Sequence, residues 1–352
     1  MPDATVSFSG SYPRHPQLHP SSAAGTSTRF DGGMLYRSAN VPEAMIPDER
    51  CSWQIKDYEC LEILNRKPVR FVCRARCKVS GILVALKVFN KRELSHSDCD
   101  HSPHLSEAQV RREIALHSSL QHPGVCQLYA AFEDNRTIVL VLELCRQGSL
   151  AERLERGRIP DALGKQVLRE LFAALSYIHS RGVLHRDISP GNLLFGDDGK
   201  LRIADFGLAV DMRCHAPRNA AGTVYYCAPE VLRPLVDPHI FPTWDYGLQA
   251  DVWSCGVIAY EVLTGAPLFD EDLDREITMR KIASGDLRLP QPLSAAEKAF
   301  LGCALQVDPA ARATVDQLAN HKWLVEPCRK RRLNFLGSGL RLRRTLSLIR
   351  ED

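Results

Sequence analysis

The stretch that decides the fold is His185-Arg186-Asp187-Ile188-Ser189-Pro190-Gly191-Asn192, which is followed at a short distance by Asp205-Phe206-Gly207. It sets a carboxylate at the head of a short polar loop, an amide five residues later, and a second carboxylate beyond a predicted strand-turn-strand segment. Oxygen donors with this spacing suit one task, which is to hold Mg²⁺ and a triphosphate beside a hydroxyl group. We therefore expect the rest of the chain to support such a site.

The composition is that of a globular protein. The chain has 352 residues, of which 45% are hydrophobic, and 45 basic against 42 acidic residues leave a net charge of +3. A charge this balanced argues against nucleic acid as the main partner. The most apolar runs, 137–145 and 252–264, are shorter than the ~20 residues that a membrane-spanning helix needs. The 12 scattered cysteines, with no secretory signal before them, predict reduced thiols in a cytoplasmic or nuclear protein.

The two ends of the chain differ from its middle. Residues 1–57 are rich in Ser, Pro, Gly, Ala and His, which predicts a disordered N-terminal arm; Arg14, Arg29 and Arg37, together with few acids, leave a targeting peptide as an alternative. Residues 325–352 form a basic C-terminal tail. It fits contact with an acidic partner or a membrane surface, and equally a solvated tail or a nuclear-localisation stretch. We expect a monomer.

Between the ends, at 58–324, the pattern changes from strands to helices near residue 145. Apolar and β-branched runs predict five strands at 60–64, 71–75, 83–89, 128–132 and 137–142. Apolar residues at helical spacing predict helices at 107–120, 165–180, 251–264, 273–284, 294–304 and 314–320. The sequence thus predicts an α+β fold of two lobes, a small five-stranded lobe with one main helix (58–144) and a larger helical lobe (145–324). Ligand sites commonly lie at such a junction.

Further motifs occur in the order found in one enzyme family. They are Val84-Ala85-Leu86-Lys87 in an apolar strand, Glu113 in the first helix, the two stretches quoted above, and Ala228-Pro229-Glu230 beyond them. From about Tyr58 to Trp323, the chain resembles the eukaryotic protein kinases of the Ser/Thr type. Three phrases, Gln121-His122-Pro123, Leu128-Tyr129-Ala130-Ala131-Phe132 and His321-Lys322-Trp323, add a weak similarity to the Aurora and polo-like kinases.

The resemblance implies transfer of the γ-phosphate of Mg-ATP to Ser/Thr hydroxyls of protein substrates. Lys87, held by Glu113, would touch the α- and β-phosphates, and Asp187 would orient the hydroxyl or accept its proton. Asn192 and Asp205 would hold metal ions. The implied adenine-binding residues are Val72, Ala85 and Leu194 on its faces and the backbone of Glu143 and Cys145 at its edge, with Leu142 controlling the depth of the pocket. Taken singly, Lys87 could be a snorkelling edge lysine, and Asp187 and Asp205 turn-capping carboxylates.

The resemblance also implies several structural contacts. A stacked spine would join the lobes through His185, Phe206, Leu128 and His117, which makes His117 a core histidine and not a catalyst. Glu230 and Arg312 would form a buried ion pair that anchors the activation segment, which the resemblance places between Asp205-Phe206-Gly207 and Ala228-Pro229-Glu230. Asp251 would brace the catalytic loop, 185–192.

The chain departs from the family at the glycine-rich loop, 65–72. Asn65, Lys67 and Arg70 replace its three glycines, so backbone N–H groups cannot cradle phosphates in the usual way. We interpret Lys67 and Arg70 as solvent-facing residues, because exposed basic residues are common. The alternative, that their side chains supply charge to the phosphates, stays open.

Two further departures concern activity. Ser189 stands where Ser/Thr kinases carry a lysine that contacts the γ-phosphate, and its absence could slow transfer by ~10²-fold or more. Between Phe206 and Thr223 no Ser, Thr or Tyr occurs, so Arg186 lacks its usual phosphate partner and activation-loop phosphorylation is not expected. Thr223 resembles the threonine that shapes the substrate groove.

Two hypotheses follow from these motifs and departures. The leading one is an active Ser/Thr protein kinase with reduced activity, because all five residues Lys87, Glu113, Asp187, Asn192 and Asp205 are retained. The alternative is a pseudokinase scaffold that binds protein partners, which the missing glycines and Ser189 favour. A separate segment with His96, Cys99, His101 and His104 has irregular spacing, so we interpret it as a loop and not as a zinc site.

Overall fold

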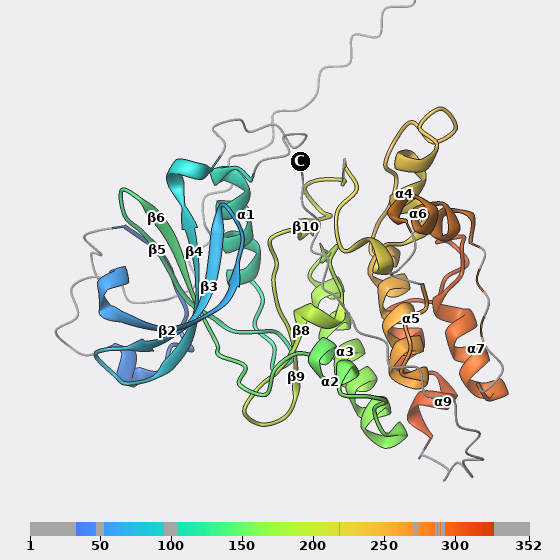
Figure 1. The fold of residues 1–352 in the computed structure, drawn as a ribbon, viewed down its shortest axis with the longest axis horizontal. Helices are drawn as coiled ribbons and strands as arrows, with labels where there is room; N and C mark the ends of the chain where they lie inside the picture. The colour runs from blue at the N-terminus through green and yellow to red at the C-terminus, as the bar shows by residue number, and fades with distance from the viewer. Residues whose placement is uncertain are drawn as a thin grey trace, which may run out of the picture.

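The computed structural model of the chain describes residues 33–46, 53–94, 105–217, 219–269, 274–285, 287, 289 and 293–326. These residues form a β-sheet lobe and a helical lobe, which lie at the two sides of Figure 1. The predicted two-lobed α+β fold is therefore confirmed. The outer parts of both predicted terminal segments, and the His96–His104 region, lie outside the described residues.

The sheet lobe is built on six antiparallel strands in the order β1-β5-β6-β4-β3-β2. The strands are β1 (Met34–Arg37), β2 (Tyr58–Arg66), β3 (Arg70–Cys77), β4 (Leu83–Asn90), β5 (Leu128–Glu133) and β6 (Thr137–Leu142). β4 lies inside the sheet, between β3 and β6, and six of its eight residues are buried. Its nearly continuous apolar run suits a strand covered on both faces.

The sixth strand corrects the prediction of five strands and, for the described residues 33–46 and 53–57, the prediction of a disordered arm. β1 pairs with β5 at the edge of the sheet, where Tyr36 lies opposite Ala131. Downstream of β1, Met45 and Trp53 are almost completely buried in the core on the same sheet. These apolar residues stand singly or in short groups such as Ala44-Met45-Ile46, so they form no periodic pattern. Each is buried by the sheet and not by its own neighbours in sequence, which single-sequence periodicity does not detect.

All six predicted helices are present, with ends shifted by a few residues. α1 (Glu107–Ser118) belongs to the sheet lobe and begins with a capping box between Ser106 and Gln109. The helical lobe contains α2 (Leu150–Glu155), α3 (Asp161–Ser180), α4 (Pro229–Val236), α5 (Gln249–Thr264), α6 (Arg275–Ser284), α7 (Ala295–Ala304), α8 (Val315–Ala319) and α9 (Lys322–Val325). In the described part of the chain, no helix has both the length and the apolar character to cross a membrane.

α5 is the central helix of this lobe, as its strongly apolar sequence predicts. Fourteen of its sixteen residues are buried, and it ends at Gly265, whose φ of 73° few other residues adopt readily. Two short antiparallel strand pairs lie at the side that faces the sheet lobe: β7 (Val183–Leu184) pairs with β10 (Val210–Asp211), and β8 (Leu193–Phe195) pairs with β9 (Leu201–Ile203). The quoted loop therefore runs between two short strands that rest on buried helices.

Candidate active site

An ion-pair network at the centre of the site joins the two lobes. Lys87 Nζ on β4 donates to Glu113 Oε1 on α1 at 2.6 Å and to Asp205 Oδ1 at 2.8 Å. The side chains of Lys87 and Glu113 are each 4% exposed. A lysine buried to this degree requires charged partners, because an unpaired charge is costly away from water. The expected pairing is present, and the alternative of a snorkelling edge lysine is wrong.

Asp205 has a second cationic partner that the sequence does not predict. Arg70 Nη2 donates to Asp205 Oδ2 at 3.1 Å, and the Arg70 side chain is only 20% exposed. The interpretation of Arg70 as solvent-facing is therefore wrong, whereas Lys67 is exposed. Burial alone would raise the pKa of Asp205, but the charges of Lys87 and Arg70 outweigh it and hold this pKa well below its usual value.

Asp187 is held at both carboxylate oxygens. Asp187 Oδ1 accepts from the backbone N–H and the hydroxyl of Thr223 at 2.9 and 2.8 Å, and Oδ2 accepts from Asn192 Nδ2 at 2.7 Å. These contacts fix the carboxylate relative to both the loop and the activation segment. The predicted substrate-groove residue Thr223 thus touches the predicted base.

The candidate metal ligands are not equally available. Asn192 uses its Nδ2 on Asp187, and its Oδ1 has no hydrogen-bond partner among the described residues. Both oxygens of Asp205, by contrast, already accept from cations. The donor types therefore suit a hard cation such as Mg²⁺, but Arg70 competes with it at Asp205.

Backbone strain marks both ends of the site. Arg186 and Asp205 have φ values of 68° and 62°, and they are the only non-glycine residues with positive φ in the described ranges. Asp251 at the start of α5 holds the first of these turns, because its carboxylate accepts from the backbone N–H groups of His185 and Arg186 at 2.8 and 2.9 Å. The expected bracing by Asp251 is confirmed.

Aromatic and histidine rings stack between the lobes. The ring centroid of Phe206 lies 4.6 Å from that of His117 and 5.0 Å from that of His185. His117 Nε2 lies 2.6 Å from the carbonyl oxygen of Cys126, which can only accept, so this nitrogen carries the hydrogen. Burial lowers the pKa of His117 to about 4, and the ring is neutral at pH 7. His117 is the core histidine that was expected.

The activation segment provides Arg186 with neutral partners. Arg186 Nη1 donates to Asn219 Oδ1 at 2.9 Å and to the Tyr246 hydroxyl at 3.3 Å, and Nε donates to the carbonyl of Leu208 at 2.5 Å. The guanidinium that would meet a phosphate in many kinases is thus satisfied by an amide and a carbonyl. The sequence does not predict the contact of Asn219 with Arg186, because asparagine is common in loops and forms no motif here.

A buried ion pair fastens the far end of the activation segment. Arg312 Nη1 and Nη2 donate to the two carboxylate oxygens of Glu230 at 2.7 and 3.0 Å. The Arg312 side chain is 0% exposed and also donates to the carbonyls of Gln249 and Gln306. The predicted ion pair is confirmed, and the Arg312 guanidinium is bound by Glu230 and by the two carbonyls.

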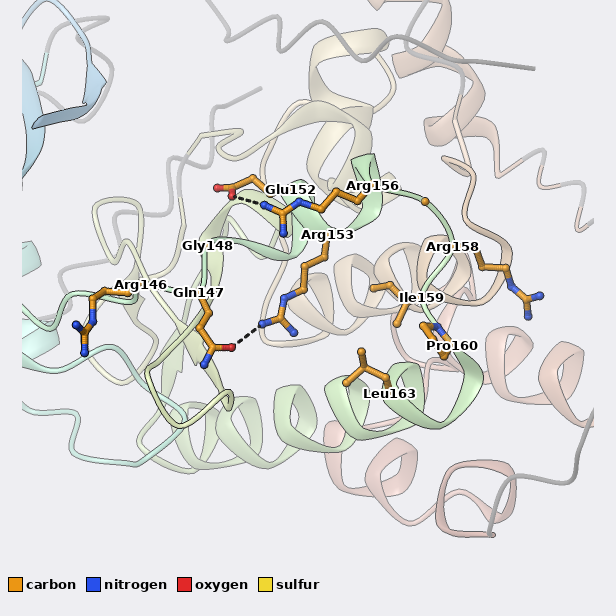
Figure 2. A pocket seen from close by; sticks show the side chains of 11 residues that line it. Arg146, Gln147, Gly148, Glu152, Arg153, Arg156, Arg158, Ile159, Pro160 and Leu163 are labelled. Atoms are coloured by element: carbon orange, nitrogen blue, oxygen red, sulfur yellow. Dashed lines mark hydrogen bonds and ion pairs between the residues drawn. The ribbon is translucent and has the colours of Figure 1, made fainter. Parts of the chain in front are cut away.

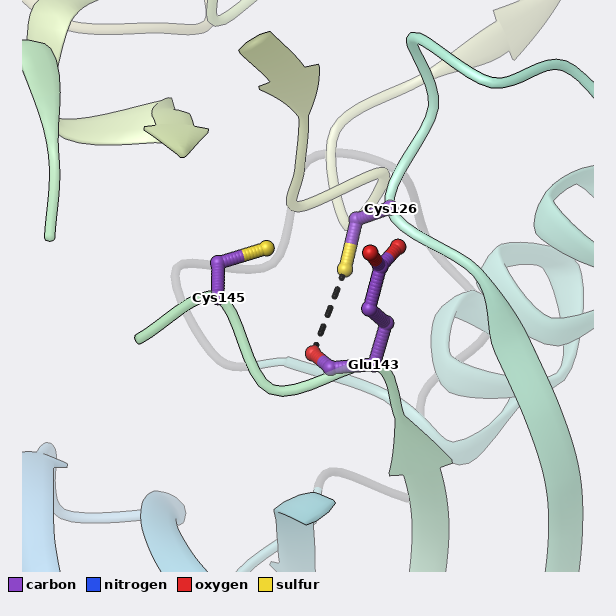
Figure 3. A group of neighbouring side chains, drawn as sticks. All are labelled: Cys126, Glu143 and Cys145. Carbon is purple, nitrogen blue, oxygen red and sulfur yellow. Dashed lines mark hydrogen bonds between the residues drawn. The ribbon is translucent and has the colours of Figure 1, made fainter. Parts of the chain in front are cut away.

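Three side chains that the sequence does not predict to be neighbours meet at the hinge, which is the segment 143–149 between β6 and α2 that joins the two lobes. Figure 3 shows Cys126, Glu143 and Cys145, whose ligand-capable atoms all lie within 4.8 Å of one another. A hydrogen bond with Cys145, together with burial, raises the pKa of Cys126 well above its usual value. The Glu143 carboxylate of this group already has Arg202 and the backbone N–H of Gln127 as partners.

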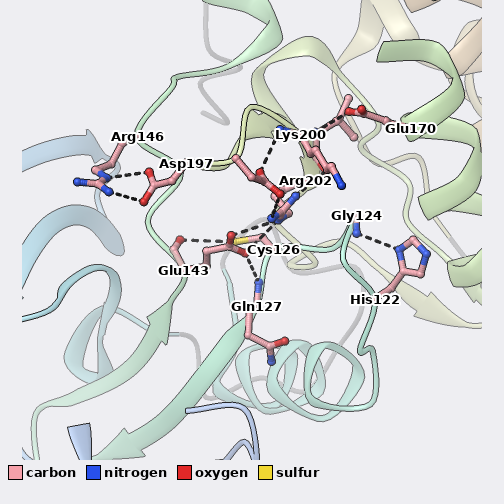
Figure 4. Close-up of polar contacts among 12 residues, drawn as sticks. His122, Gly124, Cys126, Gln127, Glu143, Arg146, Glu170, Asp197, Lys200 and Arg202 are labelled. Carbon is pink, nitrogen blue, oxygen red and sulfur yellow. Dashed lines mark hydrogen bonds and ion pairs between the residues drawn. The ribbon is translucent and has the colours of Figure 1, made fainter. Parts of the chain in front are cut away.

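The side chain of Glu143 is directed into the helical lobe. Figure 4 shows its carboxylate beside Arg202 of β9, with Oε1 at 3.2 Å from Nε, while Oε2 accepts from the backbone N–H of Gln127. This arrangement leaves the backbone of the hinge, and not the carboxylate, as the part of Glu143 that can meet a base. The carbonyl of Glu143 receives a weak contact from the Cys126 thiol at 3.7 Å.

The residues expected around adenine come from both lobes. Val72 lies opposite Lys87 on neighbouring strands, and Ala85 lies opposite Leu142. Leu194 comes from β8 in the helical lobe. Their contact with a base stays a prediction.

Two pockets are also present, one away from the network and one beside Arg70. The first, of about 620 Å³, is rich in arginine and lies over α2 and the start of α3 (Figure 2). Its arginines are Arg146, Arg153, Arg156 and Arg158. Three of the four are paired with nearby carboxylates, so most of the charge is already compensated. The second, of about 690 Å³, lies at the tip of the β2–β3 hairpin and includes Lys67 and Arg70.

Comparison with known proteins identifies the family. Residues 70–324 match the family model described as protein kinase domain. The chain is 33% identical over 293 residues to an Aurora kinase of Schizosaccharomyces pombe, covering 82% of this chain and 77% of that protein. It is 33% identical over 313 residues to Aurora kinase B of Xenopus tropicalis (88% and 81%) and over 277 residues to the serine/threonine-protein kinase Aurora-1 of Arabidopsis thaliana (78% and 88%). The chain therefore belongs to the protein kinase family and is a Ser/Thr protein kinase of Aurora-like character.

Proposed function

We propose that this kinase transfers the γ-phosphate of ATP to Ser/Thr hydroxyls of protein substrates at a reduced rate and without activation-loop phosphorylation. Membership of the family implies ATP as phosphate donor, typically with Mg²⁺. The observation that carries the proposal is the doubly held carboxylate of Asp187 beside Ser189, since the group that would meet the hydroxyl is retained and the usual neighbouring cation is not.

In this proposal each residue acts by position and charge. Lys87, fixed by Glu113, binds the α- and β-phosphates. Asp187 accepts a hydrogen bond from the incoming hydroxyl and orients it for attack, with Thr223 and Asn192 keeping the carboxylate in place. The hinge backbone at Glu143 and Cys145 binds the adenine edge, between Val72 and Ala85 on one face and Leu194 on the other.

The pseudokinase scaffold is the second candidate, and a specific observation favours it. Asp205, the expected metal ligand, is bound by Arg70 and Lys87. Transfer of label from γ-labelled ATP to a generic protein substrate, followed by phosphoamino-acid analysis, separates the two. Phosphoserine or phosphothreonine supports the kinase; measurable ATP binding with no transfer at any substrate concentration supports the scaffold.

Restoring the missing cation should increase the rate. In Ser189→Lys, we expect kcat to rise about 10-fold or more, because a lysine at this position would contact the γ-phosphate in the transition state. Steady-state kinetics with the same protein substrate measure the effect. Ser180→Lys, an added lysine at the exposed end of α3, is the matched control and should leave kcat unchanged. Equal kcat in Ser189→Lys and the unmodified chain would contradict the proposed cause of reduced activity.

Independence from phosphorylation can be tested at Asn219. Replacement by Ala removes one of the three partners of the Arg186 side chain, and we expect a loss of about 5- to 10-fold in kcat, whereas Asn219→Asp keeps an acceptor and should retain activity. Phosphatase treatment of the unmodified chain should have no effect. A large loss of activity after phosphatase, with mass spectrometry showing phosphate removed from residues 207–230, would contradict this part of the proposal.

A further inference from the structure

The β2–β3 turn is a fixed hairpin and not a pliable glycine loop. The Lys67 N–H donates to the Arg70 carbonyl at 2.8 Å, which closes the turn around Pro68 and Val69. The Val69 carbonyl accepts from the Asn90 N–H at 3.0 Å, which ties the turn to the end of β4. None of the residues that replace glycines has a positive φ, so the turn carries side chains without backbone strain.

This fixed turn directs the Arg70 guanidinium to the Asp205-Phe206-Gly207 segment, 135 residues away in sequence. Besides the 3.1 Å contact of Nη2 with Asp205, Nη1 lies 3.5 Å from the point where a Cβ on Gly207 would stand. The guanidinium thus lies against the turn that contains Asp205, the carboxylate to which the family resemblance assigns metal binding. Lys87 occupies the other oxygen of Asp205.

The guanidinium also has hydrogen-bonding capacity to spare. Its single hydrogen-bond partner among the described residues is Asp205, although an arginine side chain has five N–H donors. A guanidinium can hold a carboxylate through one donor and phosphate oxygens through others. Arg70 and Lys87 therefore form a pair of cations on one carboxylate, at the proposed phosphate site.

We propose that Arg70 supplies at Asp205 the positive charge that a divalent cation brings in related kinases, so that this chain binds nucleoside triphosphate without requiring a metal ion. In this arrangement Arg70 bridges Asp205 and the phosphate oxygens from the position of the third glycine. The inference rests on the proposed nucleotide site but does not depend on phosphate transfer.

The test is the affinity for ATP, measured by isothermal titration calorimetry in EDTA and in MgCl₂. We expect the dissociation constant of the unmodified chain in EDTA to lie within about 10-fold of that in MgCl₂. Arg70→Gly restores the family glycine and should weaken binding in EDTA by about 10-fold or more, with a smaller change in MgCl₂. Arg70→Met keeps the bulk of the side chain without its charge and should weaken binding in EDTA to a similar degree. Agreement between the two variants would show that the effect comes from the lost charge and not from the greater backbone freedom of glycine.

The matched control is Arg76→Gly, on the same strand, where the arginine is about half exposed and pairs with Glu59. It should bind ATP as the unmodified chain does under both conditions, and thermal melting checks that all variants fold. Binding that requires MgCl₂ in the unmodified chain, or tighter binding in EDTA after Arg70→Met, would overturn the inference while leaving the kinase proposal standing. Failure to bind ATP in either buffer would overturn both this inference and the kinase proposal. Phosphate transfer in MgCl₂ is expected in the first case and not in the second, so a transfer assay distinguishes them.

Discussion

Asp187→Asn should lower kcat for phosphate transfer by about 10³-fold while changing the dissociation constant of ATP by less than about threefold. In the proposed mechanism the Asp187 carboxylate accepts a hydrogen bond from the incoming hydroxyl. An amide at this position offers one acceptor in place of two. Its NH₂ group would face either Thr223 or Asn192, both of which donate to Asp187 in the present structure. The variant therefore loses proton acceptance and orientation together.

The measurement combines single-turnover transfer kinetics with calorimetric titration of ATP. Asp197→Asn is a suitable control, because Asp197 is an exposed carboxylate of the helical lobe whose partner is Arg146 (Figure 4). The control should retain full activity. Transfer by Asp187→Asn at the rate of the unmodified chain would show that another group serves the hydroxyl, and the site would have to be reassigned.

The family motifs predict the contacts of the site that depend on residue type. Lys87 with Glu113, Asp251 with the loop backbone, and the ring stack at Phe206 are all present as expected. Such contacts are predictable because a buried charge or ring admits few partners, and the motif order identifies them. Secondary structure is predictable where apolar periodicity is strong, as in α3, or where a long run is mostly apolar, as in α5.

The remaining features depend on geometry that no local pattern encodes. Arg70 meets Asp205 only because the β2–β3 turn folds over the end of β4. Its composition alone favoured an exposed arginine, and that interpretation was wrong. β1 was missed for a related reason: it is stabilised by pairing with β5, nearly 100 residues later in the chain, and not by any pattern of its own.

The departures from the family share one consequence, which is a redistribution of positive charge. The catalytic loop has lost a cation at Ser189, and the glycine-rich loop has gained one at Arg70 that faces the same site. The Arg70 guanidinium contacts Asp205, whereas Ser189 stands two residues after Asp187, the proposed acceptor of the hydroxyl. We therefore expect this chain to retain nucleotide affinity better than it retains transfer rate, which the Ser189→Lys and Arg70→Met variants measure separately.

Arg312→Met should cause the largest loss of stability of any single change considered, about 3–5 kcal/mol in the free energy of unfolding. The Glu230 carboxylate would be left without the cation that binds both of its oxygens, and Glu230 itself is buried. The carbonyls of Gln249 and Gln306 would each lose a donor as well. Chemical denaturation monitored by fluorescence gives the free energy, and the exposed Arg280→Met on α6 is the matched control, expected to change it by less than about 0.5 kcal/mol.

A double-mutant cycle decides whether the charge of Glu230 is the cause. Glu230→Gln combined with Arg312→Met removes both charges. The double variant should therefore lose about 1–3 kcal/mol less free energy of unfolding than the sum of the losses of the two single variants. Additive effects would show that the loss comes from the carbonyls and the packing of Arg312 against Trp253, whose ring centroid lies 5.2 Å from the guanidinium carbon. Coupling would instead show that this ion pair holds the end of the activation segment in place, and with it Thr223 against Asp187.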